Sequence, residues 1–252
     1  MNPSSRGLAR IGVLVPFTNT NLEADMALLR PDGISFHYAR LGGYDRDEIP
    51  DEAQMAGLGA SDLDEPLELL MGVRPDVVMY GCTSATLAHG PEFDRSLADK
   101  ITALSGAATV TAAGALVSAL QSLEVAKIGF ASPYVAQLNE EAIGFLARSG
   151  IETVHRSEVT VALDNYGQGE LTPQKVFDLG RAADHPEAEV IVLSCTDMRS
   201  VEVIARLESE LCKPVITSNQ AQFWSCMRRA GITDKLQGFG QLFNNAGTTL
   251  LP

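Results

Sequence analysis

The sequence predicts an α/β protein made of two similar Rossmann-like lobes, each built around a parallel sheet of four or so strands. Short apolar runs, bounded by glycine, proline or charged residues, alternate with longer amphipathic stretches along the chain. Two segments of the first half also match two segments of the second half in character and spacing. Alternation of this kind is typical of βαβ units, so we expect helices on both faces of each sheet.

The expected strands are short and apolar throughout, as strands buried on both faces are. In chain order they are IGVLV at 11–15, VVMY at 77–80, ATVTA at 108–112, KIGFAS at 127–132, VIVLS at 190–194 and PVITS at 214–218. Between them, amphipathic patterns such as LEADMALLR (22–30) and QLNEEAIGFLARSG (137–150) predict helices.

The internal repeat sets the domain organisation. The matching segments are IGVLVPFTNTNLE from Ile11 with IGFASPYVAQLNE from Ile128, and PDVVMYGCTSATL from Pro75 with AEVIVLSCTDMRS from Ala188. The intervals also agree, with 70 residues from Gly12 to Cys82 and 66 from Gly129 to Cys195. A repeat of this length indicates duplicated α/β lobes rather than a solenoid of short units. We expect a first lobe at 1–117 plus 221–252, a second at 118–220, and a site between them.

Composition limits the partners. The chain has 252 residues, 32 acidic against 19 basic side chains and a formal net charge of −13, which disfavours binding to nucleic acid and to anionic membranes. No run of eighteen apolar residues and no secretory leader pattern is present, so we expect a soluble cytoplasmic protein. A small anionic substrate remains compatible with this charge, because helix N-termini and hydroxyls can bind a carboxylate locally.

The four cysteines are Cys82, Cys195, Cys212 and Cys226. Their spacing fits neither a zinc site nor a disulfide framework, so we expect no metal. Cys82 and Cys195 end the two matching strands, where parallel sheets bind ligands and where a helix N-terminus lowers a thiol pKa. Two facing lobes would bring both thiols to opposite sides of one bound molecule, as a base and an acid or as one nucleophile assisted by the second thiol. Cys212 and Cys226 have no such match, so we expect them to be packing residues.

Polar residues near the same strand ends suggest a carboxylate site. Thr20 to Glu23 fits a capping box that opens a helix, and Asn19 just before it can donate its amide N–H to an anion or act only as a turn residue. Tyr134 takes the equivalent place in the second lobe, as a hydroxyl donor or as a packing residue. The segment DNYGQGELTP resembles a cover loop in which Asn165 could close on a ligand or lie in an ordinary turn. Sequences typical of dinucleotide binding, phosphoryl transfer, serine hydrolysis and zinc proteolysis are missing.

These motifs resemble the maleate cis-trans isomerase branch of the aspartate/glutamate racemase superfamily, which includes hydantoin racemase and arylmalonate decarboxylase. The matching residues are P-x-T-N-T at 16–20, Y-G-C-T at 80–83, S-P-Y at 132–134, N-Y-G at 165–167 and L-S-C-T at 193–196. The resemblance implies a cofactor-independent two-lobe enzyme, a homo-oligomer, and a small carboxylate substrate. A fainter similarity links the chain to members of this branch used in ectoine utilisation.

Residue roles also come from the resemblance. It implies that Cys82 is the nucleophile or base and Cys195 the acid, and that Asn19, Tyr134 and Asn165 hold the substrate carboxylate. Hydroxyl or backbone donors of Thr83, Ser84 and Thr196 would surround the same anion. The Thr83-Ser84 pair departs from maleate isomerases toward racemases and arylmalonate decarboxylase, whereas the presence of both thiols departs from the decarboxylase, which resembles a one-cysteine design.

The leading hypothesis is therefore a cis-trans isomerase of maleate type that acts on a small dicarboxylate. An amino-acid racemase of the aspartate, glutamate or hydantoin type would use the same residues and remains an alternative. An arylmalonate-type decarboxylase, in which hydroxyls stabilise an enediolate and one cysteine reprotonates it, is another. A small-molecule binding protein on a duplicated α/β scaffold is the alternative outside enzymes, and it would not require reactive thiols.

Overall fold

The computed structural model describes residues 7–42 and 47–244, which form two four-stranded parallel sheets. The first sheet has the order β2-β1-β3-β4 and the second β6-β5-β7-β8. Their bounds are β1 Ala9–Pro16, β2 Ile34–Leu41, β3 Val77–Tyr80, β4 Ala108–Thr111, β5 Lys127–Ser132, β6 Glu152–Glu158, β7 Val190–Leu193 and β8 Val215–Thr217. The predicted fold class is confirmed, with the same strand order in each lobe.

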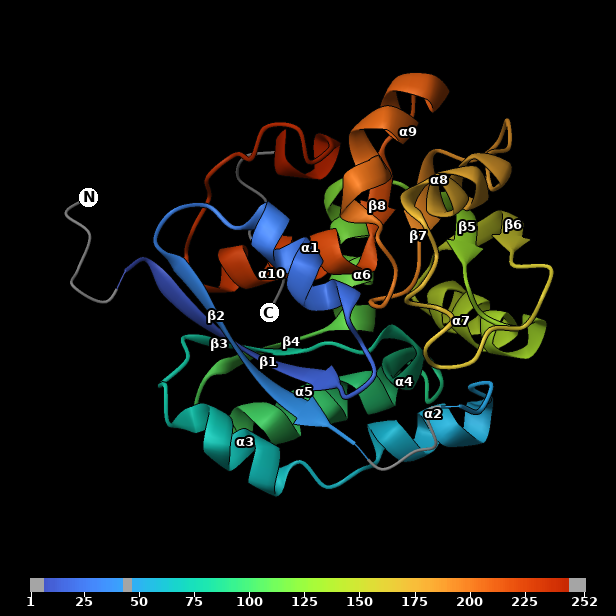
Figure 1. The fold of residues 1–252 in the computed structure, drawn as a ribbon. Coiled ribbons are helices and arrows are strands. Elements are labelled where there is room, and N and C mark those ends of the chain that lie inside the picture. The colour runs from blue at the N-terminus through green and yellow to red at the C-terminus, as the bar shows by residue number, and fades with distance from the viewer. Residues whose placement is uncertain (1–6, 43–46, 245–252) are drawn as a thin grey trace.

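Helices cover both faces of each sheet (Figure 1). In chain order they are α1 Asn21–Leu29, α2 Glu52–Gly59, α3 Asp64–Met71, α4 Thr83–Leu87, α5 Pro91–Ser105, α6 Ala112–Ser122, α7 Ala136–Arg148, α8 Pro173–Ala182, α9 Ile204–Leu211 and α10 Ser218–Arg229, with short 3₁₀ turns η1 Val201–Val203 and η2 Gln241–Asn244. On the first sheet, α3 and α5 lie on the face opposite α10, and on the second, α8 and α9 lie on the face opposite α7. No helix among the described residues is long and apolar enough to span a membrane.

Two of the four edge strands, β2 and β6, were not expected from the sequence. Each pairs in parallel with the first strand of its lobe, β2 in unbroken register from Ala9↔Ile34 to Pro16↔Leu41. Both are largely half-exposed, with sequences ISFHYARL and ETVHRSE. Since an edge strand of this kind is only partly buried, its polar residues interrupt the apolar run by which central parallel strands are recognised.

Helices α6 and α10 join the lobes. They pack against each other, and each contacts both β4 of the first sheet and β8 of the second. One hydrophobic core cluster accordingly runs through both lobes, from Ile11 and Met79 through Leu116 and Phe223 to Val192. The lobes, 1–117 plus 221–252 and 118–220, stay a prediction, because α10 contacts β3 and β4 of the first sheet while α10 and η2 also contact β8 of the second. Residues 1–6, 43–46 and 245–252 lie outside the described part.

Candidate active site

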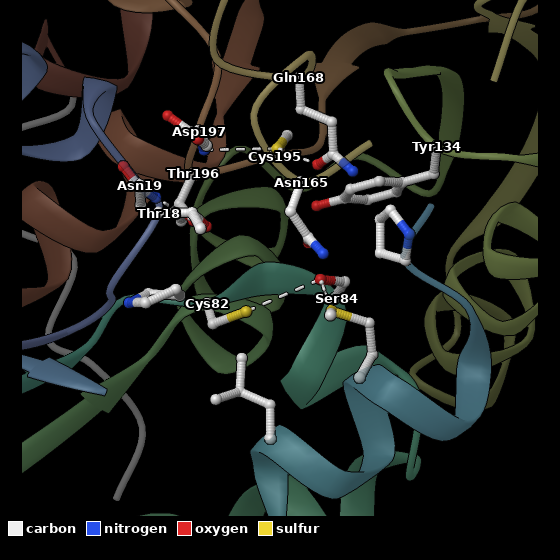
Figure 2. Close-up of a pocket in the computed structure, with 14 residues that line it drawn as sticks. Thr18, Asn19, Cys82, Ser84, Tyr134, Asn165, Gln168, Cys195, Thr196 and Asp197 are labelled. Atoms are coloured by element: carbon white, nitrogen blue, oxygen red, sulfur yellow. Dashed lines mark hydrogen bonds between the residues drawn. The ribbon is translucent and has the colours of Figure 1, made fainter. Parts of the chain in front are cut away.

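A pocket between the lobes brings the two matching cysteines together (Figure 2). Cys82 and Cys195 lie on opposite sides of it. Its water-accessible volume is about 30 Å³, room for water but less than a four-carbon dicarboxylate occupies, so binding of such a molecule would require lining side chains to shift. The lining residues are Pro16, Thr18, Asn19, Pro50, Met55, Leu58, Cys82, Ser84, Tyr134, Asn165, Gln168, Cys195, Thr196 and Asp197.

The two cysteines occupy equivalent positions after the corresponding strands of the two lobes. Cys82 follows β3 and is the N-cap residue of α4, whereas Cys195 lies two residues beyond the end of β7. Because β3 and β7 hold the same place in the two sheets, the repeat places both cysteines at the carboxyl edges where parallel sheets bind ligands. Both side chains are nearly inaccessible, with 5% and 3% of their surface exposed.

Burial has a larger effect on the pKa of Cys82 than the N-terminus of α4. Desolvation raises the pKa of this thiol above its ordinary value, although hydrogen bonds from Ala85 and Ser84 oppose the shift. The Ser84 hydroxyl is 3.7 Å from the Cys82 sulfur and also donates to the Met55 sulfur at 2.9 Å. The expected lowering of the thiol pKa is therefore wrong, because the desolvation of the buried sulfur outweighs the hydrogen bonds that favour the thiolate.

Cys195 lies among more polar neighbours but is equally desolvated. Burial raises its pKa well above the ordinary range, and a hydrogen bond with Tyr134 acts in the opposite direction. The backbone N–H of Asp197 donates to the Cys195 sulfur at 3.3 Å, and the thiol points to Gln168 Oε1 at 3.8 Å. Burial also raises the pKa of Tyr134 well above its ordinary value, so this hydroxyl stays a hydrogen-bond donor.

The N-terminus of α1 is capped from the other lobe. Asp197 Oδ1 accepts hydrogen bonds from the backbone N–H groups of Thr20 and Asn21, at 3.0 and 3.1 Å, and from Asn21 Nδ2 at 2.8 Å. Within the first lobe, Asn19 Oδ1 accepts from the N–H groups of Asn21 and Leu22. The expected capping box is wrong, since the Thr20 side chain makes no capping bond.

These caps fix the Asn19 amide toward the pocket. With Oδ1 held by the helix, Asn19 Nδ2 donates to Thr196 Oγ1 at 3.1 Å. Thr196 Oγ1 in turn donates to the carbonyl oxygen of Gly81, directly before Cys82, at 3.0 Å. A chain of hydrogen bonds thus crosses from one cysteine segment to the other.

Asn165 closes the pocket between the β6–α8 connection and the start of α2. Its Nδ2 donates to the Glu48 carbonyl at 3.1 Å and to Gln54 Oε1 at 2.8 Å, and its backbone N–H donates to the same carbonyl at 3.2 Å. Asn165 thus links the β6–α8 connection to the segment that leads into α2.

Of the eight candidate site residues, seven line the pocket and Thr83 does not. The Thr83 side chain lies in α4, and its buried hydroxyl has no hydrogen-bond partner in the described part of the chain. Sequence reasoning missed Met55, Gln168 and Asp197 as lining residues. Asp197 adjoins the second C-T motif and Gln168 lies in the recognised cover loop, so both had a positional signal, whereas Met55 had none.

Among the described residues, no group of three His, Cys, Asp or Glu side chains is arranged to hold a metal ion. The lining residues that can react or bind are two thiols, hydroxyls, amides and one carboxyl group. The fold and this pocket define the class of protein: a two-lobed α/β enzyme with a cysteine from each lobe at an interlobe site.

Comparison with known proteins identifies the family. A family model for arylmalonate decarboxylase matches residues 11–243, so the chain belongs to the arylmalonate decarboxylase family. A maleate isomerase from Nocardia farcinica is 28% identical over 246 residues, covering 94% of this chain and 96% of that protein. An arylmalonate decarboxylase from Bordetella bronchiseptica is 26% identical over 260 residues, covering 94% and 97%.

A solved structure shows the same fold. It is a Nocardia farcinica maleate cis-trans isomerase, in a cysteine-to-serine variant with a covalently bound succinylcysteine intermediate. Its TM-score is 0.86 at 25% sequence identity, covering 93% of this chain and 98% of that chain. These matches confirm the predicted relationship to maleate isomerases and arylmalonate decarboxylase. They also confirm the predicted class, an isomerase-type enzyme.

Proposed function

We propose that this protein is a cis-trans isomerase of maleate or a closely similar small dicarboxylate, and that its two pocket thiols carry the reaction. The observation that carries the proposal is the placement of Cys82 and Cys195 at equivalent strand ends of opposite lobes, on opposite sides of one pocket. In the related Nocardia structure one cysteine is replaced, yet a succinylcysteine is present, so a second cysteine forms the adduct there. The pair of cysteines in one pocket supports the same two roles in this chain, with one cysteine forming the covalent adduct and the other transferring the proton.

The proposed reaction begins with addition to the double bond. The Cys82 thiolate attacks one alkene carbon and forms a carbon–sulfur bond, while the Cys195 thiol gives its proton to the other alkene carbon. The former double bond is then single and rotates. Cys195, now a thiolate, removes a proton from the same carbon, the double bond re-forms, and the Cys82 thiolate leaves from the trans product.

Neutral donors would hold the substrate carboxylates. The pocket offers the Ser84 and Tyr134 hydroxyls beside the two thiols and the amides of Asn19 and Asn165, but no Lys, Arg or His among its lining residues. We propose that Ser84 and Tyr134 bind one carboxylate and that the amides bind the other once the cover opens. Desolvated donors of this kind are stronger than in water, because the local dielectric constant is low.

Proton NMR in D₂O with maleate tests the function. The wild type should produce a fumarate signal, and the Cys82→Ser and Cys195→Ser variants should lose it. Cys226→Ser is the matched control, because Cys226 is buried but does not line the pocket, and it should retain activity. Deuterium entering Cα of aspartate, glutamate or hydroxyaspartate, without fumarate formation, would replace the isomerase proposal by a racemase.

Decarboxylation is the second candidate, because the family match and the Ser84 hydroxyl beside Cys82 favour it. In that reaction hydroxyl donors stabilise an enediolate and one cysteine returns a proton. Carbon dioxide release from phenylmalonate by the wild type, with no fumarate formed from maleate, would establish it.

From the resemblance we also propose a homo-oligomeric assembly, and from the composition a cytoplasmic location. Sedimentation of the purified full-length chain tests the first, since a monomer across the micromolar range would contradict it.

A further inference from the structure

We propose that Thr196 is a positioning residue that fixes the Cys82 and Cys195 segments relative to each other across the lobes. The kinetic part of this inference rests on the proposed isomerase function, but its geometric part does not. The sequence resemblance assigned Thr196 to substrate binding, whereas the hydrogen bonds of its side chain point to a different task.

The Thr196 hydroxyl links the residues next to both thiols. It donates to the Gly81 carbonyl at 3.0 Å, and it accepts from Asn19 Nδ2 at 3.1 Å. Gly81 directly precedes Cys82, and Thr196 directly follows Cys195. A hydroxyl has one proton to donate, and here Gly81 receives it, so this proton is not available to a substrate.

The Gly81 end of this link is rigid. The Gly81 N–H donates to the Leu14 carbonyl in β1 at 2.7 Å. A Cβ atom on Gly81 would lie 2.4 Å from Leu22 Cδ2 and 3.2 Å from the Leu14 oxygen, so any larger residue would have to displace the buried Leu22 side chain of α1. The Thr196 hydroxyl therefore bonds a carbonyl whose position is fixed by β1 and α1.

The Thr196 end is held as firmly. Asn219 Nδ2 donates to the Thr196 carbonyl at 3.1 Å and to Asp25 Oδ2 at 2.8 Å. Asp25, which is buried, also accepts from the Ser200 hydroxyl at 3.3 Å. Thr196 is 3% exposed and is thus bonded through both its hydroxyl and its carbonyl group.

Two-thiol chemistry depends on such a link. The thiols must address opposite ends of one double bond, and catalytic groups need to be held to within about 0.5 Å of the productive geometry. Removing the hydroxyl leaves the Gly81 carbonyl without this donor and frees the two segments to shift apart.

Kinetics of Thr196→Val and Thr196→Ser test the consequence with maleate. Valine keeps the shape and removes the hydroxyl, so kcat should fall about 100-fold while KM changes less than about threefold. Serine keeps the hydroxyl and should restore kcat to within about fivefold of the wild type. Thr102→Val is the matched control, because its hydroxyl bonds Thr109 on the exposed side of α5, and it should leave kcat unchanged.

An unchanged kcat in Thr196→Val, or an increase in KM as its main effect, would overturn the proposal. A failure of Thr196→Ser to rescue activity would do the same. If Thr196→Val does not fold, Thr196→Ala undergoes the same comparison, since its smaller side chain adds no new apolar contact.

Crystal structures of the wild type and Thr196→Val test the geometry without any substrate. We expect the distance between the Cys82 and Cys195 sulfurs to change by more than about 0.5 Å in the valine variant and to return in Thr196→Ser. Sulfurs that keep their wild-type separation would refute the positioning role. If the wild type proves inactive on maleate, the proposed function fails, and this comparison still decides the role of Thr196.

Discussion

At the residue scale, the environment of the thiols determines how the site must work. Burial raises the pKa of both Cys82 and Cys195, while hydrogen bonds from Ser84, Ala85 and Tyr134 oppose the shift without reversing it. The thiolate is accordingly a minor species in the free protein near neutral pH. A reaction that begins with thiolate attack is then limited by the fraction of protein in which Cys82 has lost its proton.

The raised thiol pKa predicts that the catalytic efficiency increases with pH. Since the free protein's thiol pKa is raised, kcat/KM for maleate should increase with pH between 7 and 9, by about tenfold per unit while the thiolate fraction is small. Initial rates of fumarate formation in buffers of constant ionic strength measure this. A flat or falling profile over this range would show that a thiol with a raised pKa is not the nucleophile.

At the element scale, the N-terminus of α1 depends on a residue from the other lobe. The helix has no cap from Thr20, and Asp197 supplies the acceptor for its first N–H groups. This arrangement ties the orientation of Asn19, and through it the pocket, to the loop that carries Cys195. Helix capping here serves as an interlobe contact.

Replacing this cap should cost stability. Asp197→Ala removes the acceptor that the Thr20 and Asn21 N–H groups share, while Asn19 Oδ1 still accepts from Asn21 and Leu22, so the free energy of unfolding should fall by about 1 kcal/mol, the usual value of an N-cap residue. Asp197→Asn retains an oxygen acceptor and should recover most of the loss. Urea unfolding of the three proteins measures this, and equal stability of the alanine variant and the wild type would contradict the capping role.

Sequence patterns predicted some of the strands and pocket residues but not others. Six strands were predicted from their apolar runs, among them the edge strands β4 and β8, and the paired C-T motifs at the ends of β3 and β7 placed both cysteines in one site. The edge strands β2 and β6 lack this pattern because they are half-exposed. Met55 reaches the pocket from α2, a helix outside the repeat motifs, so only the folded arrangement reveals it.

At the scale of the whole molecule, the pocket exists because two similar lobes share one core. The hydrophobic cluster is continuous through α6 and α10, which holds the two sheets with their carboxyl edges facing each other. The internal repeat predicted this arrangement. It did not predict the hydrogen bonds from Asn165 to Glu48 and Gln54, or the small pocket volume of about 30 Å³. Both depend on side-chain packing between segments that are distant in sequence.

The central claim is that a thiol from each lobe acts on one substrate, with Cys82 forming the covalent bond. Intact-protein and peptide mass spectrometry of Cys195→Ser incubated with maleate tests it most directly. This variant lacks the thiolate that takes the proton back, whereas the proton for the addition can come from solvent or the serine hydroxyl, as the succinylcysteine in the related serine variant supports. We therefore expect a mass increase of one maleic acid, located on the peptide that contains Cys82 and lost in Cys82→Ser/Cys195→Ser. A wild type that forms fumarate while Cys195→Ser carries no adduct, or carries it on another residue, would contradict the account.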